Sequence, residues 1–167
     1  ENIASLKIFK SAGFEPIFSN SDVITLKRLF KKISFKEVVE EDCDVLFELL
    51  KKRAHSISHQ SIPTKNEHIR FMKTKPYRYW VVVLDGIRPV GTFYLQSDNS
   101  IGLNLHQPTR PLVSKILRHI RESFEPLKEV KSKVPSYFYV NVSYANKKLS
   151  EILCELDKVP IQTSYKI

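Results

Sequence analysis

Histidine side chains and runs of basic residues are the groups in this chain best suited to chemistry. His59, His68 and His106 can exchange protons because histidine titrates near neutral pH, although each also suits a polar surface or capping role. Lys and Arg number 27 against 18 Asp and Glu, a formal net charge of +9. The basic residues are mixed with carboxylates, so a solvated face or an anionic small ligand explains them better than nucleic acid, whose usual motifs are missing from the sequence.

Length and composition describe one ordinary globular domain. The chain has 167 residues, 42% of them hydrophobic, and no apolar run near the roughly 18 residues of a membrane span. Cys43 and Cys154 lack CxxC or Cys/His spacing and have apolar neighbours, so we expect buried, reduced thiols, no metal site and a cytoplasmic protein. Without an initiator Met or a secretory leader, the sequence is expected to be a piece of a longer protein.

The first thirty residues predict a helix followed by a hairpin. Residues 2–12 have helical apolar spacing, Gly13 suits a helix C-cap, and residues 15–29 indicate a strand, a turn and a strand. A unit of this size cannot bury its own apolar faces. We therefore expect it to pack against the main unit or a neighbouring chain.

The main unit, residues 33–167, predicts an α/β (α+β) fold that alternates strands and helices. Asp42 precedes one helical run, and Thr64 and Glu67 form a capping box for a second helix. Asp85-Gly86 indicates a hairpin, and Pro111 opens a long amphipathic helix. The expected strands are 34–39, 80–84, 90–95, 101–105 and 137–142, with a helix at 146–156 and a final strand or short hairpin at 159–167.

Several short motifs follow one another along the main unit: Arg53; Ile57-Ser58-His59; Pro63-Thr64; His68; Pro76-Tyr77-Arg78-x-Trp80; Val90-Gly91-x-x-Tyr94-Leu95; Asn99-x-Ile101-Gly102; and Ile161-Gln162. These motifs and the order of elements resemble the GNAT superfamily of N-acetyltransferases, closest to a bacterial subgroup tied to amino-sugar or surface-polysaccharide pathways. Residues 2–14 also resemble the last helix and strand turn of such a domain, so residues 1–30 are expected to be the tail of a preceding GNAT-like unit or a docked helix–hairpin extension.

The resemblance implies a mixed, mostly antiparallel sheet flanked by helices, with a cleft for acetyl-CoA where the strands at 101–105 and 137–142 diverge. It also implies a pyrophosphate loop at residues 106–115, where Pro111, Val113 and Lys115 occupy positions that are usually glycine. Arg110 and Lys115 could then replace backbone donors by charge. The implied cofactor-binding residues are Leu103, Asn104, Leu105, Arg110, Pro111, Leu112, Val113, Ser114, Lys115, Asn141 and Asn146.

Direct acetyl transfer needs a base for the amine and an acid for the leaving thiolate. Ser100 stands where related proteins often have Glu, and Leu153 stands where they often have Tyr. Tyr139, Tyr144 and His106 are therefore the implied catalytic candidates. The acceptor side is expected to contain Arg53, His59, Arg78 and Trp80, although Trp80 also suits the core beside the apolar run at 81–84.

The resulting hypothesis is an enzyme that transfers an acetyl group from acetyl-CoA to a primary amine, for example on an amino sugar or sugar nucleotide. The alternative is a catalytically inactive GNAT-like module for structure, ligand sensing or partner docking within a larger enzyme. The expected partners are a small-molecule amine and a second GNAT-like unit or a homodimer partner.

Overall fold

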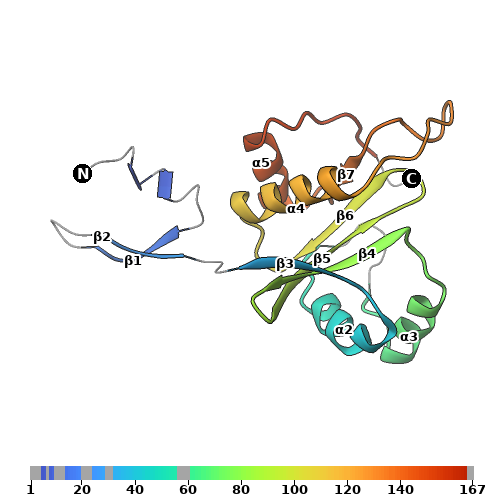
Figure 1. Ribbon diagram of the computed structural model, residues 1–167, viewed down its shortest axis with the longest axis horizontal. Coiled ribbons are helices and arrows are strands. Elements are labelled where there is room, and N and C mark those ends of the chain that lie inside the picture. The colour runs from blue at the N-terminus through green and yellow to red at the C-terminus, as the bar shows by residue number, and fades with distance from the viewer. Residues whose placement is uncertain are drawn as a thin grey trace.

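The structure is a computed structural model that describes residues 5–6, 8–9, 14–19, 24–28, 32–55 and 61–164. Its strands form a two-stranded sheet, β1 with β2, and a five-stranded sheet in the order β3-β4-β5-β6-β7. The larger sheet is mixed and mostly antiparallel and carries helices on both faces (Figure 1). The predicted fold class is confirmed.

The five-stranded sheet is built mostly from neighbours in sequence. The strands β3 (Ile33–Glu37), β4 (Tyr79–Asp85), β5 (Arg88–Leu95) and β6 (Ser100–Leu105) pair antiparallel in that order. Gly86 makes the predicted turn between β4 and β5 with a φ of +64°, which glycine adopts without steric cost. Strand β7 (Tyr139–Asn141) pairs parallel to β6, after the chain has crossed one face of the sheet as a helix.

Two pairs of helices cover opposite faces of this sheet (Figure 1). One face carries the short 3₁₀ helix η1 (Glu40–Asp42), α2 (Cys43–Lys51) and α3 (Lys65–Lys73), and the other carries α4 (Arg110–Ser123) and α5 (Lys147–Glu155). The main apolar core lies under α4 and α5, where Val83, Phe93 and Ile116 have no exposed surface. Burying side chains of this size stabilises a fold by about 1.5–3 kcal/mol each.

Local capping interactions determine where several helices begin. The hydroxyl of Thr64 accepts from the backbone N–H of Glu67, whose carboxylate accepts from the Thr64 N–H at 2.7 Å, so the predicted capping box is confirmed. Asn146 caps α5 by accepting from the N–H of Leu149 at 3.2 Å. These contacts satisfy N–H groups that have no partner inside the helix.

The N-terminal strands are β1 (Phe14–Ser19) and β2 (Ile24–Arg28), and their antiparallel pairing confirms the predicted hairpin. Ser5, Leu6, Ile8 and Phe9 are helical, while Gly13 lies outside the described residues. Figure 1 shows the hairpin to one side of the five-stranded sheet. In the described part of the chain the two sheets share no strand pair, and packing of this segment against the main unit or a neighbouring chain stays a prediction.

Two expectations were wrong. Residues 159–164 form no strand, and Val159 and Ile161 are 80% and 60% exposed, because these apolar side chains have no sheet edge to pack on; residues 165–167 lie outside the described ranges. Cys43 is half-buried and Cys154 is exposed, so neither thiol belongs to the core, although both are free as expected.

Within the described ranges, every helix is too short or too polar to cross a membrane.

Candidate functional site

The first feature of the candidate site is an early end to the pairing of β6 with β7. Their ladder joins Ser100 with Tyr139, Ile101 with Val140, and Gly102 with Asn141. Strand β6 continues for three more residues, which pair only with β5 on the other side. The sheet therefore stops being continuous at Gly102, as the predicted divergence requires, and residues 103–105 present a backbone edge that an extended ligand could pair with.

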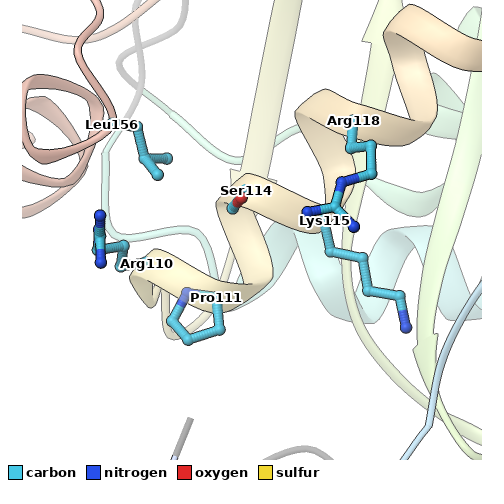
Figure 2. Close-up of a pocket in the computed structure, with 6 residues that line it drawn as sticks. All are labelled: Arg110, Pro111, Ser114, Lys115, Arg118 and Leu156. Atoms are coloured by element: carbon cyan, nitrogen blue, oxygen red, sulfur yellow. The ribbon is translucent and has the colours of Figure 1, made fainter. Parts of the chain in front are cut away.

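A basic hollow lies at the N-terminus of α4, just after β6 ends. Its volume is about 430 Å³, and Figure 2 shows the residues that line it, namely Arg110, Pro111, Ser114, Lys115, Arg118 and Leu156. Three of the six carry a positive charge, and the positive end of the helix dipole adds to their field. Such an arrangement favours phosphate groups.

Few backbone donors of α4 remain for a ligand. Thr109 is the N-cap, and its hydroxyl accepts from the Leu112 N–H at 3.4 Å. Pro111 has no N–H. Among the first three residues of α4, the backbone N–H of Arg110 is therefore the one that neither proline nor the Thr109 cap takes away from a ligand. The residues present fit phosphates mainly through the side chains of Arg110, Lys115 and Arg118, and less through a backbone cradle.

The predicted cofactor loop is only partly at this surface. Leu112 and Val113 are 1% and 0% exposed, so both residues belong to the core and neither presents surface to a ligand. Ser114 and Lys115 line the hollow, while Arg118 was missed by the sequence analysis. Helical periodicity could have identified Arg118, because positions 110, 114 and 118 lie on one face of a helix.

The other predicted cofactor residues are distributed along the edges of the opening. Leu103, Asn104 and Leu105 occupy the half-buried end of β6, and Asn141 is exposed at the last paired position of β7. The side chain of Asn146 is committed to capping α5. The structure thus brings the β6 residues next to the helix that bears the basic hollow, whereas Asn146 has a local structural role.

The three predicted catalytic residues lie in different surroundings. The hydroxyl of Tyr139 donates to Asp98 at 3.0 Å, at the end of the β6–β7 ladder where the strands are paired. Burial raises the pKa of Tyr139, and this hydrogen bond and the negative charge of Asp98 raise it further. Burial opposes ionisation of Asp98, but hydrogen bonds from Ser100 and Tyr139 outweigh it and lower its pKa. Tyr144 is 86% exposed beneath the ammonium of Lys147, and His106 is exposed after β6.

The expected acceptor residues do not all face the same side. The guanidinium of Arg78 donates to Asn99 and to the Glu125 carbonyl, which ties it to the segment before β7. Trp80 lies on the α3 face among aromatic rings, including Tyr77 at 5.1 Å and His68 at 6.3 Å. Arg53 follows α2 and acts electrostatically on Tyr77 and Tyr94 of the same group. His59 lies outside the described residues.

Two buried ring nitrogens of this aromatic group have no hydrogen-bond partner among the residues that the structure describes: Nε2 of His68 and Nε1 of Trp80. His68 is only 4% exposed, and burial lowers its pKa. The imidazole is therefore neutral at pH 7.

Several solved structures with a similar fold are described as acetyltransferases. An acetyltransferase from Thermus thermophilus superposes with a TM-score of 0.57 at 15% identity, covering 76% of this chain and 86% of its own. A spermidine N-acetyltransferase chimera of the Vibrio cholerae protein and hSSAT gives 0.54 at 15% identity, covering 75% and 79%. The aminoglycoside N-acetyltransferase AAC(6')-Ib11 gives 0.50 at 11% identity, covering 75% and 84%.

No family model and no curated protein sequence matches this chain. At such low identities the likeness establishes the fold of GNAT-type acetyltransferases for the chain. Activity has to be argued from its own residues.

Proposed function

We propose that this protein is an N-acetyltransferase that transfers an acetyl group from acetyl-CoA to a primary amine. The observation that carries the proposal is the basic hollow at the N-terminus of α4, lined by Arg110, Lys115 and Arg118, next to the point where β6 loses its pairing with β7. Bound acetyl-CoA would supply an acetyl thioester, an acyl group already activated for attack by an amine.

The protein's own groups would hold this donor at two places. Arg110, Lys115 and Arg118 provide charge-assisted hydrogen bonds to phosphates, and the unpaired side of residues 103–105 provides backbone groups for an extended amide-containing arm. Placing the donor in this way lowers the barrier mainly through orientation. Tyr139, Tyr144 and His106 stay part of the proposal as proton-transfer candidates.

The acceptor is proposed to bind on the α3 face of the sheet, near Arg53 and Trp80. Aromatic faces and a cation suit an amine that also carries a planar or anionic group, such as an amino sugar linked to a nucleotide. Polyamines and aminoglycosides are named as substrates of two structural neighbours and belong in the same trial. We also propose a cytoplasmic location, which the two free cysteines support. The proposed protein partner is a second copy of the chain in a dimer or a preceding GNAT-like unit.

The direct test measures binding and transfer separately. Calorimetry with coenzyme A and acetyl-CoA reports binding, and release of free thiol reports transfer to a panel containing a polyamine, an aminoglycoside and an amino-sugar nucleotide. We expect both ligands to bind, more weakly as salt is raised because the contacts are ionic. Failure of coenzyme A to bind at low salt refutes the proposal.

A second candidate function is a GNAT-like module that binds without catalysing transfer. The specific observation in its favour is the shortage of backbone donors in α4, caused by Pro111 and by the Thr109 cap, together with a buried Ser100 in place of a carboxylate. Tight binding of coenzyme A with no thiol release by any amine would support this module.

A further inference from the structure

A row of side chains crosses the sheet on the face covered by α3. Trp80 on β4 pairs with Tyr94 on β5, and Tyr94 pairs with Gly102 on β6, so the three positions lie side by side on one face. Tyr77 stacks on Tyr94, with ring centroids 4.0 Å apart and an angle of 17° between the planes. This stacking fixes the direction in which the Tyr94 ring points.

The hydroxyl end of Tyr94 lies directly over Gly102. A β-carbon built on Gly102 would collide with the Cζ, Cε2 and hydroxyl oxygen of Tyr94, so only glycine leaves room for the ring. Gly102 is also the last residue of β6 that pairs with β7. The phenol of Tyr94 is therefore held at the point where the two strands part.

The hydroxyl of Tyr94 keeps its proton at neutral pH and can therefore act as a donor. Burial is the largest influence on Tyr94 and raises its pKa, while the positive charge of Arg53 opposes the rise. Arg53 thus favours negative charge that develops beside this hydroxyl.

We propose that Tyr94 is the proton donor to the leaving sulfur in acetyl transfer, oriented by Tyr77 and supported by the charge of Arg53. This inference rests on the proposed function. The amine nitrogen bonds to the acetyl carbon, and the carbon–sulfur bond breaks with its electron pair on sulfur. Sulfur takes the Tyr94 proton, and the proton lost by the amine nitrogen returns to Tyr94 through solvent.

The position of Tyr94 differs from those of the tyrosines singled out by sequence. Tyr139 is engaged with Asp98 at the closed end of the strand ladder, and Tyr144 stands 86% exposed before α5. Tyr94 combines a ring fixed by stacking with a hydroxyl that lies at the opening. Tyr94 belongs to the motif Val90-Gly91-x-x-Tyr94-Leu95, but its place over Gly102 was not identifiable from local sequence, because the pairing of β5 with β6 creates that placement.

The test replaces Tyr94 with Phe, which keeps the stacked ring and removes only the hydroxyl. For the amine that serves best as acceptor, we expect kcat to fall about 100-fold, the lower range for loss of a general acid, with KM for acetyl-CoA changed less than about threefold. Tyr77→Ala removes the ring that stacks on Tyr94 and should give a smaller fall in kcat. Tyr79→Phe is the matched control, a partly exposed tyrosine on β4 that packs on Phe124, and should leave kcat unchanged.

A binding measurement gives a readout that does not depend on turnover. Calorimetry compares coenzyme A with desulfo-coenzyme A, which lacks the sulfur atom. A hydroxyl that donates to sulfur should make the unaltered protein prefer coenzyme A by about fivefold, and Tyr94→Phe should abolish this preference while desulfo-coenzyme A binds equally to both proteins.

The outcomes separate the two proposals. If coenzyme A binds and transfer proceeds, but Tyr94→Phe changes neither kcat nor the sulfur preference, the role of Tyr94 is refuted and the acetyltransferase proposal stands. If the unaltered protein does not bind coenzyme A, the proposed function fails and the role of Tyr94 fails with it. A loss of kcat together with loss of the sulfur preference supports the assignment.

Discussion

Asn99 and Leu127 hydrogen-bond to each other in both directions: Nδ2 of Asn99 donates to the Leu127 carbonyl at 2.9 Å, and the Leu127 N–H donates to Oδ1 of Asn99 at 2.7 Å. The same Nδ2 donates to the Pro135 carbonyl at 2.8 Å. Asn99 has no exposed surface. One buried amide thus attaches the segment between α4 and β7 to the turn before β6, and so holds β7 beside the candidate site.

Asn99→Ala is expected to destabilise the fold by about 3 kcal/mol or more, because buried backbone groups lose their partners. The substitution also places alanine at a φ of +66°, which asparagine tolerates better. Asn99→Gly relieves the backbone strain and keeps the loss of hydrogen bonds, so chemical denaturation of both variants separates the two contributions. A change below about 1 kcal/mol in Asn99→Gly would contradict the role given to the side chain.

The basic hollow makes a prediction about binding. Arg110→Ala and Arg118→Ala should each weaken coenzyme A by on the order of 1.5–3 kcal/mol in calorimetry, the size of a hydrogen bond to a charged group. Arg121→Ala is the control, because Arg121 is also an exposed arginine of α4 and does not line the hollow. Equal weakening by all three substitutions would mean that general charge, and not the hollow, binds the ligand.

The missing backbone donor at Pro111 can be restored. Pro111→Ala returns an N–H to the first turn of α4, and we expect coenzyme A to bind about two- to tenfold more tightly, the range of one net hydrogen bond. Val113 also occupies a position where the resemblance implies glycine, but Val113→Gly is a poor test, because the Val113 side chain is fully buried and its removal would leave a core cavity. Unchanged affinity in Pro111→Ala would show that phosphates do not approach the helix backbone.

Features that depend on neighbouring residues were predictable from sequence. The capping box of Thr64 and Glu67 and the turn at Asp85-Gly86 each follow from a few adjacent residues, and both are present. The order of elements in the main unit followed from the same signals. The resemblance to acetyltransferases agrees with the fold found by structural comparison.

Features that depend on long-range pairing were not predictable. Stacking of Tyr77 on Tyr94 and the fit of Tyr94 over Gly102 require the β5–β6 register, which local periodicity does not determine. The same limit explains the wrong strand at residues 159–164: alternating apolar residues favour a strand, but a strand forms only where a partner edge is available. The hydrogen bond that Arg78, an expected acceptor-side residue, donates to Asn99 spans 21 residues of sequence, and no local pattern predicts it.

His68 predicts how stability depends on pH. Burial lowers its pKa in the folded protein below the ordinary value of 6.5, so at mildly acidic pH the unfolded chain binds a proton that the folded chain does not. Stability should therefore be fully present above pH 6.5 and decline as pH falls from about 6.5 through the folded pKa. His119, whose pKa burial also lowers against the opposing charge of Glu122, contributes in the same direction.

The measurement is the free energy of unfolding in urea at a series of pH values from about 7.5 to about 5, the range in which histidine titrates. His68→Phe keeps a flat ring against Phe47 and Trp80 and removes the titrating group, so its stability should fall less steeply with acid than that of the unaltered protein. His55→Gln, at an exposed position after α2, should leave the slope unchanged. A steeper decline in His68→Phe than in the unaltered protein would mean that His68 is charged in the folded state and has a partner there.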